Sequence, residues 1–412
     1  MKDFGTKMAY DKLFTLLEEE RNRQQNGINL IASENYAPKI IREVVGSILM
    51  NKYVEGLPGR RYYSGCEFID QIENEAIETF KEIFKAEHAN VQPHSGSQAN
   101  FAVYFALLNP QDTILSMNLA AGGHLTHGSK VSMAGSLYNI ISYGVDQQTE
   151  IINYDEVEKL AHEHKPKLII AGASSYSRII DFQRFSEIAK SVGAYFMADV
   201  AHVAGLIAAG VYPSPVPFAD VVTFTTHKTF RGPRGGVILC KKELANKIDK
   251  AVMPGIQGGA FAHEIAAKNL AASLTKEIEF TEYQKNVLVC AKAMADEFIK
   301  LGYKIISGGT DTHLFLVDVS KLQLQGKEVE QALEKINIFV NRNAIPFDTL
   351  PPLQAGGVRI GVAAIVSRNA TRNLCIQIVQ IIHELLGKLA SGDDYQYLKN
   401  KVSNISRQLQ DI

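Results

Sequence analysis

Between residues 167 and 240, short β-branched and apolar runs alternate with stretches whose apolar residues recur at about the helical period of 3.6. We expect strands at 168–173, 194–198, 221–224 and 236–240. The helix between the first two strands has its apolar face at Phe182, Phe185, Ile188 and Val192. This rhythm of strand and helix predicts an α/β fold with a mostly parallel sheet that helices cover.

The flanking segments have different patterns. An amphipathic helix is expected up to Asn26, a helix at 72–84, a strand at 89–93 and a helix at 98–108. After a glycine-rich turn at 255–259, a long helical region extends to about Leu301. A smaller α+β unit follows, with strands near 303–306, 313–317 and 338–340, a helix from Lys327 and two final helices. The first of these final helices has an apolar stripe at Leu374, Ile378, Ile381, Ile382, Leu385 and Leu389. We therefore expect an N-terminal helical arm (1–30), a large α/β domain (31–280) and a small C-terminal α+β domain (281–412).

Composition and charge narrow the functional classes. Lysine and arginine total 43 against 44 acidic residues, so no overall basic field favours nucleic acid. The longest apolar stretch, near 203–211, is far shorter than the ~20 residues of a membrane helix, and the N-terminus has no signal-peptide pattern. The four cysteines form no C-x-x-C pair, which is typical of reduced thiols rather than of a disulfide framework or a zinc site. A cytoplasmic protein without a membrane or nucleic-acid partner is expected.

Polar residues follow several of the predicted strands. Lys228 comes after the run 221–226, Asp199 ends the strand before it, and Ser174 follows the strand at 168–173. Ligands in open α/β sheets bind at these carboxyl ends. A desolvated lysine there can form a Schiff base with pyridoxal phosphate, and a carboxylate can meet the pyridinium nitrogen. A solvated loop lysine and a helix-capping aspartate are the plainer alternatives.

Other segments suggest binding groups. His94-Ser95-Gly96-Ser97 lies between a strand and a helix, where free amides and the helix dipole can hold a phosphate, although a serine there can be only an N-cap. Glycines beside His124 would let its ring lie flat against another ring, and no H-E-x-x-H spacing supports a metal. Arg359, among apolar neighbours, would suit a substrate carboxylate or an internal salt bridge. The loop 51–66 is dense in aromatic and charged residues, as functional loops are.

These segments together resemble the serine hydroxymethyltransferase family. The resemblance runs from about Leu13 to the last helix. It is carried by the following motifs in this order: L-I-A-S-E-N-Y, N-K-Y-x-E-G-x-P-G-x-R-Y-Y-x-G-C, Q-P-H-S-G-S-Q-A-N, G-G-H-L-T-H-G, D-V-A-H-V-A-G-L and T-T-H-K-T-x-R-G-P-R-G-G. It implies the type I fold of pyridoxal-phosphate enzymes, with a seven-stranded sheet, and a homodimer whose active sites are shared between subunits. The implied reaction converts serine and tetrahydrofolate reversibly to glycine and 5,10-methylenetetrahydrofolate through Schiff bases of the cofactor.

The resemblance also implies roles for individual residues. Lys228 would bind the pyridoxal aldehyde, Asp199 the pyridine nitrogen and His202 the region of the ring hydroxyl, with His124 stacked on the ring. The other residues implied at the cofactor are Ser95, Gly96, Ser97, Ser174 and Thr225, with Tyr53 and Gly259 from the other subunit. Those implied at the substrates are Ser33, Tyr63, His227, Arg359 and the proton-transferring Glu55, and on the folate side Leu119, Gly123, His124, Leu125, Asn343, Pro351, Pro352 and Leu353.

Departures from the family pattern concentrate on the folate side. The family usually has histidine at Ala121, proline at Ala260 and asparagine at Thr312, and S-P-F-x-T-S-G-I-R-I-G-T where this chain has P-P-L-Q-A-G-G-V-R-I-G-V from Pro351. Weakened tetrahydrofolate binding with ordinary amino-acid binding is therefore expected. Two alternatives stay open: a folate-independent aldolase acting on β-hydroxy amino acids, and a catalytically silent protein that binds RNA or another ligand.

Overall fold

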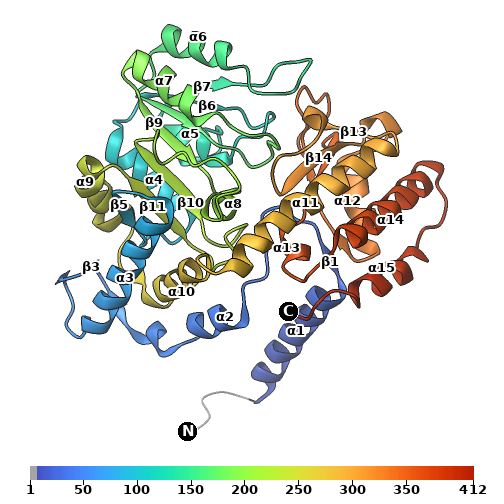
Figure 1. Ribbon diagram of the computed structural model, residues 1–412, viewed down its shortest axis with the longest axis horizontal. Coiled ribbons are helices and arrows are strands. Elements are labelled where there is room, and N and C mark those ends of the chain that lie inside the picture. The colour runs from blue at the N-terminus through green and yellow to red at the C-terminus, as the bar shows by residue number, and fades with distance from the viewer. Residues whose placement is uncertain (1–6) are drawn as a thin grey trace.

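The computed structural model describes residues 7–412 and is built around a seven-stranded sheet (Figure 1). In spatial order the strands are β5 (His88–Asn90), β11 (Gly236–Cys240), β10 (Val221–Thr225), β9 (Tyr195–Asp199), β8 (Leu168–Ala171), β6 (Thr113–Met117) and β7 (Asn139–Tyr143). Strands β10, β9, β8, β6 and β7 run parallel, and β11 is antiparallel to both of its neighbours. The expected mostly parallel seven-stranded sheet is confirmed.

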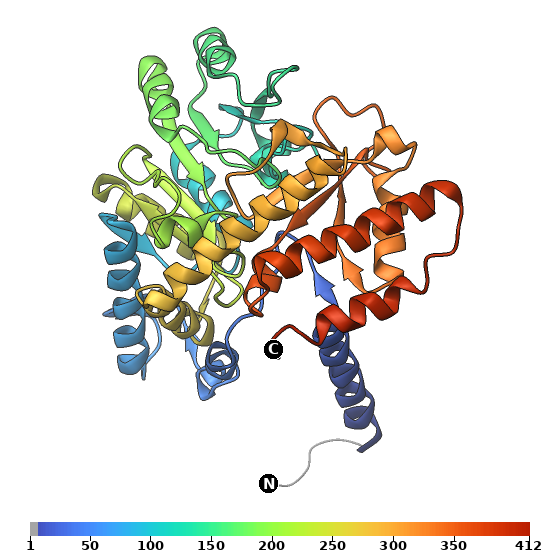
Figure 2. The same cartoon turned by 45° about the vertical axis from the view of Figure 1, so that its right-hand side comes forward.

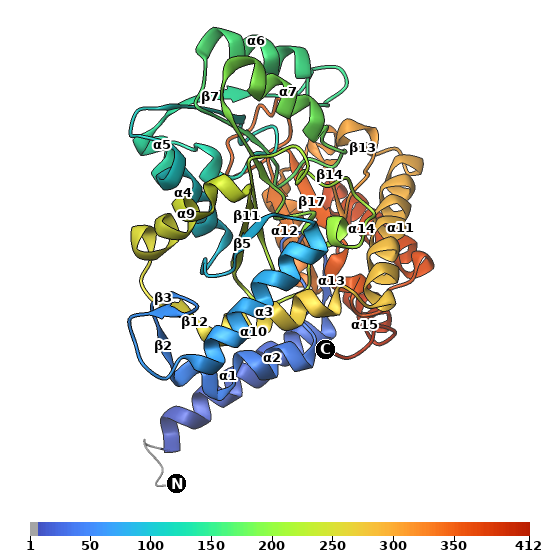
Figure 3. The same ribbon diagram turned by 60° about the vertical axis from the view of Figure 1, so that its left-hand side comes forward.

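Alternate residues of the central strands enter two separate cores. In β8, Leu168 and Ile170 pack into one core, while Ile169 and Ala171 pack into the other. Helices α4 (Gly96–Leu107) and α9 (Ala245–Lys250) cover the first face (Figure 3). The second face is covered by helices that include α3 (Glu67–Phe84), α7 (Phe182–Val192) and α10 (Ala262–Leu274). Covering both faces explains why β8, β10 and β11 are mostly apolar and are buried along their whole length.

The remaining elements of this part are short or peripheral. They are α2 (Lys39–Val45), η1 (Ile48–Asn51), β2 (Tyr53–Val54), β3 (Gly56–Leu57), β4 (Arg60–Arg61), η2 (Leu125–His127), α5 (Met133–Leu137), α6 (Tyr154–His164), α8 (Ala204–Ala208), η3 (Lys242–Leu244), η4 (Ala251–Ile256) and β12 (Ala260–Phe261). Strand β2 pairs with β12, which ties the loop at 51–66 to the segment after η4.

A smaller α+β unit follows, in which α11 (Ile278–Lys300) and α14 (Arg372–Ser391) lie side by side (Figure 2). Its antiparallel sheet has the order β13 (Lys304–Ile305), β14 (Leu314–Asp318), β17 (Gly357–Gly361) and β16 (Asn341–Asn343). The other elements are η5 (Ile306–Gly308), η6 (Ser320–Leu322), α12 (Gly326–Lys335), α13 (Ala363–Val366) and α15 (Leu398–Ser406). The predicted stripe on α14 is buried except for half-buried Leu389. By length and composition α14 could cross a membrane, but its buried face packs against α11 as the core helix of a globular unit does.

Several boundaries and pairings differ from the expectations. Helix α3 starts at Glu67 rather than at residue 72, and strands β6, β7 and β17 were not expected. The strand expected at 338–340 does not join the small sheet: β15 (Ile338–Phe339) instead pairs in parallel with β1 (Ile28–Asn29). Such a pairing joins residues over 300 positions apart, which local periodicity cannot reveal.

The N-terminal arm is α1 (Lys7–Asn26), and residues 1–6 of the arm expected at 1–30 lie outside the described residues. The buried guanidinium of Arg368 donates to the carbonyls of Gln25 and Gly27, which fixes the end of the helix to the C-terminal unit. Further out, Leu13, Phe14, Leu16 and Leu17 are exposed. The domain boundary predicted at residue 280 lies in the first turn of α11 and stays a prediction.

Candidate active site

A cavity of about 290 Å³ opens at the carboxyl ends of β8, β9 and β10, beside the start of α4. It brings together most of the residues predicted for cofactor and substrate, although they are far apart in the sequence. Its lining is Ser33, Ser95, Gly96, Ser97, Asn100, His124, His127, Ala173, Ser174, Asp199, Ala201, His202, Thr225, His227, Lys228 and Arg234. The position agrees with the rule that ligands bind at this edge of an open α/β sheet.

Lys228 lies two residues beyond the end of the predicted strand run, on a segment held by hydrogen bonds. Its carbonyl accepts from Asn35 Nδ2 at 2.8 Å, and the adjacent Thr229 hydroxyl donates to the carbonyl of His202 at 2.8 Å. The side chain is buried, and no hydrogen bond within residues 7–412 uses its ammonium group. Burial lowers the pKa of Lys228 to about 8, although the charge of Asp199 opposes this shift. A buried amine with a lowered pKa is a usable nucleophile near neutral pH.

Asp199 ends β9 and presents its carboxylate to a set of donors. Oδ2 accepts from Asn100 Nδ2 at 2.8 Å and lies 2.9 Å from His127 Nε2, and Oδ1 accepts from the Ala201 amide at 3.1 Å. Burial alone would raise the pKa of Asp199, but the hydrogen bond and charge of His127 hold it well below its ordinary value. The cavity therefore contains a carboxylate that stays ionised and fixed in orientation.

The start of α4 forms one side of the cavity. Ser95 is the N-cap, and its hydroxyl accepts from the Gln98 amide at 3.2 Å. The first amides of the helix have no intrahelical acceptor and point toward this end, where the helix dipole favours an anion. A Cβ on Gly96 would lie 2.5 Å from Thr225 Cγ2, so glycine is required for the helix to approach β10 so closely. The capping and anion-binding interpretations of Ser95 are thus compatible.

Two histidines of the cavity are held neutral. Burial lowers the pKa of His124 to about 4 and that of His227 to about 3. The Nδ1 atom of His124 lies 2.7 Å from the Thr126 hydroxyl, which fixes the orientation of the ring. A neutral, oriented ring with glycines before it is better suited to stacking on an aromatic ligand than to pairing with a charge.

Arg359, on β17 of the smaller unit, is not part of the cavity lining but bonds to Ser174, which is. Its Nη1 donates to the carbonyl of Ser174 at 2.6 Å, and its Nε donates to Asn341 Oδ1 at 3.0 Å. No carboxylate within residues 7–412 forms an ion pair with it, so the alternative of an internal salt bridge is wrong for the described chain. Burial lowers its pKa to about 10, which leaves it charged at neutral pH. A buried arginine with donors to spare is a site for an anionic ligand.

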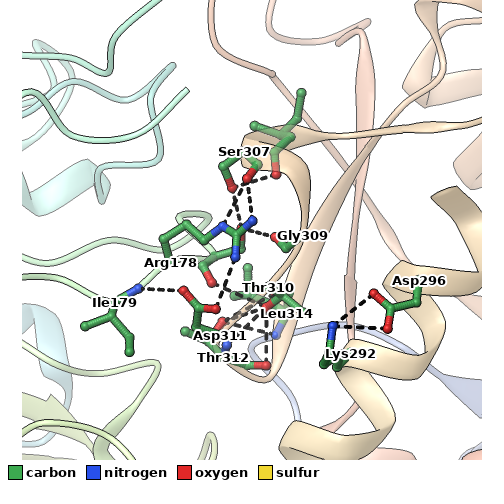
Figure 4. A network of polar contacts seen from close by, with 12 residues as sticks. Arg178, Ile179, Lys292, Asp296, Ser307, Gly309, Thr310, Asp311, Thr312 and Leu314 are labelled. Carbon is green, nitrogen blue, oxygen red and sulfur yellow. Dashed lines mark hydrogen bonds and ion pairs between the residues drawn. The ribbon is translucent and has the colours of Figure 1, made fainter. Parts of the chain in front are cut away.

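The segment after β8 is clamped to the smaller unit by Arg178 (Figure 4). The guanidinium of Arg178 donates to the carbonyl of Ser307 at 2.6 Å and forms an ion pair with Asp311 at 3.1 Å. The Asp311 amide returns a hydrogen bond to the carbonyl of Ser177 at 2.8 Å. Ser174, whose carbonyl accepts from Arg359, lies only four residues before Arg178, so the clamp holds the segment that joins Arg359 to the cavity lining.

Comparison with known proteins identifies the chain. The family model described as serine hydroxymethyltransferase matches residues 7–382. A curated protein from Coprothermobacter proteolyticus, named serine hydroxymethyltransferase, is 59% identical over 374 residues, which cover 91% of this chain and 90% of that protein. The chain belongs to the serine hydroxymethyltransferase family. It therefore has the type I fold of pyridoxal-phosphate transferases and is a glycine hydroxymethyltransferase.

The cavity fits the cofactor of serine hydroxymethyltransferases by the chemistry of its donors. Lys228 can bind an aldehyde, Asp199 can hold the proton of a pyridine nitrogen, and the amides at the start of α4 can bind a phosphate. His124, an oriented ring in the lining, can stack on an aromatic ring. Among the described residues, no group of three or more histidine, cysteine or acidic side chains could hold a metal ion.

Other residues that the family resemblance implies lie outside this cavity. Tyr53 Oη donates to Glu55 Oε1 at 3.1 Å, and the rings of Tyr53 and Tyr63 meet with centroids 5.0 Å apart. Gly259 approaches the Tyr53 ring so closely that a Cβ would lie 3.1 Å from it. These four residues form a second group, here called the tyrosine cluster, on the β2–β12 pair. Their predicted catalytic roles stay predictions.

Apart from His124, the folate-side residues predicted for a serine hydroxymethyltransferase lie outside the lining of the main cavity. Leu119 lines an adjoining cavity of about 370 Å³ that shares His124, and Leu125 is exposed beside it. Gly123 lies where any Cβ would collide with the carbonyl of Met117. Asn343 donates to Ser175 Oγ at 3.3 Å. Pro351, Pro352 and Leu353 are exposed on a loop that Asp348 organises through the amides of Leu350 and Gly356.

Sequence reasoning missed three functional groups of the cavity. Asn100 lies one turn inside α4, where nothing in the helical pattern distinguishes it. His127 follows His124 by three residues, and no sequence pattern indicates that it bonds Asp199. Arg234 lies within the motif that carries Lys228, but its position in a glycine-rich turn does not by itself predict that it lines the cavity.

Proposed function

We propose that Lys228 holds pyridoxal phosphate covalently in this cavity and that the chain uses it to interconvert serine and glycine with tetrahydrofolate. The observation that carries the proposal is the pairing, in one cavity, of a buried amine with a lowered pKa and a buried ionised carboxylate. When bound, the cofactor supplies an electron sink for cleaving the bond between Cα and Cβ of serine.

The protein's own residues would bind and orient the reactants. Asp199 holds a proton on the pyridine nitrogen, the amides of Gly96 and Ser97 bind the phosphate, and His124 covers one face of the ring. Arg359 binds the amino-acid carboxylate, because it has spare donors and no internal anion to satisfy. Ser33 and His227 lie beside Lys228 in the lining and limit the space around the substrate.

We propose further that the active enzyme is a homodimer. Tyr53 and Tyr63 are 54% and 46% exposed, and neither they nor Glu55 line the cavity of their own chain. A second copy could place this tyrosine cluster over the open cavity, where Glu55 would move protons to and from the substrate. The exposed Leu13, Phe14, Leu16 and Leu17 of α1 form an apolar surface of the kind that subunit contacts cover.

Tetrahydrofolate would enter between Leu119, Leu125 and the loop at 351–353. That loop offers two prolines and a leucine in place of the hydroxyls and the aromatic ring usual in the family, so we propose weak folate binding. Four cysteines that are all buried as free thiols support a reducing, cytoplasmic location.

Absorbance spectroscopy and product analysis test this function. The purified protein with pyridoxal phosphate should show a visible band that changes with glycine and changes again when tetrahydrofolate is added. Serine cleavage should depend on tetrahydrofolate, whereas equal cleavage without it would favour a folate-independent aldolase. A protein that shows no visible band and cleaves no serine would contradict the proposal.

A further inference from the structure

His313 is a buried histidine behind the cavity wall that the chemistry proposed above leaves without a role. It directly precedes β14, is fully buried, and is not part of the cavity lining. Its Nε2 lies 3.3 Å from Nδ1 of His202, which does line the cavity, and 3.1 Å from the carbonyl oxygen of Ala32. The two imidazole rings have centroids 5.4 Å apart and planes 26° apart, so they meet edge to edge through these nitrogens.

The position of the proton on His313 follows from its partners. A carbonyl oxygen only accepts hydrogen bonds, so the contact with Ala32 requires a proton on Nε2. Burial lowers the pKa of His313 to about 3, so the ring is neutral and its Nδ1 carries a lone pair. That Nδ1 is buried without a hydrogen-bond partner among the described residues. An unpaired buried acceptor is tolerated more often than an unpaired buried N–H, which supports the same tautomer.

The opposite arrangement is less favourable at two places. If His202 Nδ1 donated to His313, the proton of His313 would have to be on Nδ1, where nothing accepts it. In addition, the lone pair on Nε2 would face the Ala32 oxygen at 3.1 Å. His202 Nδ1 is therefore the atom that carries a lone pair, and the proton of this neutral ring lies on Nε2.

We propose that His313 is a positioning residue that holds His202 as the Nε2–H tautomer, so that His202 presents a hydrogen-bond donor to the cavity. Given the proposed function, the group that receives this donor is the ring hydroxyl oxygen of pyridoxal phosphate, which a donor stabilises in its anionic form. The inferred action of His313 passes only through His202.

The surrounding structure keeps His313 in place. Its carbonyl accepts from the Val362 amide at 3.0 Å, and the Thr310 hydroxyl donates to the carbonyl of Leu314 at 2.5 Å just beyond it. The turn before it is the one that Arg178 and Asp311 clamp (Figure 4). Ala32 is next to Ser33 of the cavity lining. The polar wall of the cavity and the turn of the smaller unit therefore meet at this histidine.

Nuclear magnetic resonance of protein labelled with ¹⁵N-histidine, without cofactor, tests the tautomer directly. A His202→Gln variant identifies the His202 signals, and the expected pattern is a protonated Nε2 with an unprotonated Nδ1. His313→Leu removes the donor and should shift His202 toward a mixture of both tautomers. His313→Gln carries an amide N–H near the position of Nε2 and should keep the wild-type pattern. Far-ultraviolet circular dichroism checks that both variants fold.

The affinity for pyridoxal phosphate provides a second measurement. The dissociation constant of pyridoxal phosphate should rise about tenfold in His313→Leu, equivalent to ~1.4 kcal/mol, and much less in His313→Gln. A protonated Nδ1 on His202 in the wild type, or an unchanged pattern in a folded His313→Leu, would overturn the proposal. The resonance experiment needs no cofactor. It therefore tests the tautomer of His202 even if the proposed function is wrong.

Discussion

The cavity wall around Lys228 and the tyrosine cluster around Glu55 differ in how completely one chain builds them. Asp199 has three hydrogen-bond contacts, Lys228 is buried, and the start of α4 is fitted closely to β10. The tyrosines of the tyrosine cluster are about half exposed, and the side chain of Tyr53 contacts Glu55 and Tyr63 of the same cluster. The wall is organised within a single chain, whereas the cluster lies outside that chain's cavity and would act on a substrate only through the proposed partner subunit.

The largest expected effect is a loss of turnover when Lys228 is removed from the cavity wall. Lys228→Ala should lower turnover by at least about a thousandfold, because no other amine lies in the lining to bind the cofactor aldehyde. Borohydride should then fail to fix cofactor to the chain, as mass spectrometry can show. Lys242→Ala, at an exposed lysine, is the control and should behave as the wild type. Undiminished turnover of Lys228→Ala would refute the assignment.

The folate side should show the next largest effect. A hydroxyl contact is worth about 0.5–1.5 kcal/mol and an aromatic contact about 1 kcal/mol, so tetrahydrofolate should bind about ten- to a thousandfold more weakly than in a relative with the usual S-P-F-x-T-S stretch. Titrating tetrahydrofolate into the enzyme–glycine complex measures this difference.

A variant of this chain sharpens that comparison. Pro351→Ser with Leu353→Phe changes two exposed positions and should recover about tenfold in folate affinity. Restoring threonine at Ala355 is a poorer choice, because its φ of 55° strains a β-branched residue. Folate affinity equal to that of the relative would show that the altered loop has no effect.

Arg359 tests the substrate side of the wall. Arg359→Leu should raise KM for serine by about ten- to a hundredfold, the loss expected for a charge-assisted hydrogen bond of about 1.5–3 kcal/mol. Cofactor affinity should change little, because Arg359 bonds Ser174 and Asn341 rather than the residues assigned to the phosphate. Steady-state kinetics and cofactor titration separate the two effects, and a KM within twofold of the wild type would remove Arg359 from substrate binding.

Much of the wall was predictable because its residues stand at strand ends or in a strand–turn–helix junction, features that local patterns reveal. Lys228, Asp199 and Ser95 were placed in this way. Contacts between distant segments were not predictable: the β1–β15 pairing, the bond from Asn100 to Asp199 and the His202–His313 pair depend on packing. Strand β17 was not predicted because glycines at both of its ends leave only Val358, Arg359 and Ile360 as a strand-like run.

Acid should lower the free energy of unfolding through two buried histidines, His202 and His313. Burial lowers the pKa of His202 and His313 below the value of about 6.5 in unfolded chains. Between about pH 6.5 and 3 these histidines bind protons in the unfolded chain but stay neutral in the folded chain. Stability is therefore lost as the pH falls. Each such histidine contributes a slope of up to about 1.4 kcal/mol per pH unit.

Denaturant titrations of the protein without cofactor at pH 7, 6 and 5 measure this slope. His313→Gln removes one of the histidines and should have a shallower slope than the wild type. Equal slopes would show that His313 does not titrate as its burial requires.

Subunit complementation tests the division between wall and cluster most directly. Mixing Glu55→Gln chains with Lys228→Ala chains should restore roughly a quarter of wild-type activity, since half of the dimers are mixed and each has one intact site. Mixing Arg359→Leu chains with Lys228→Ala chains, assayed at serine well below the raised KM, should add nothing to the residual activity of Arg359→Leu alone, because both residues are assigned to the site of the same chain. Recovery in the first mixture alone is the predicted result. No recovery in the first mixture despite proven heterodimers, or equal recovery in both, would contradict the account.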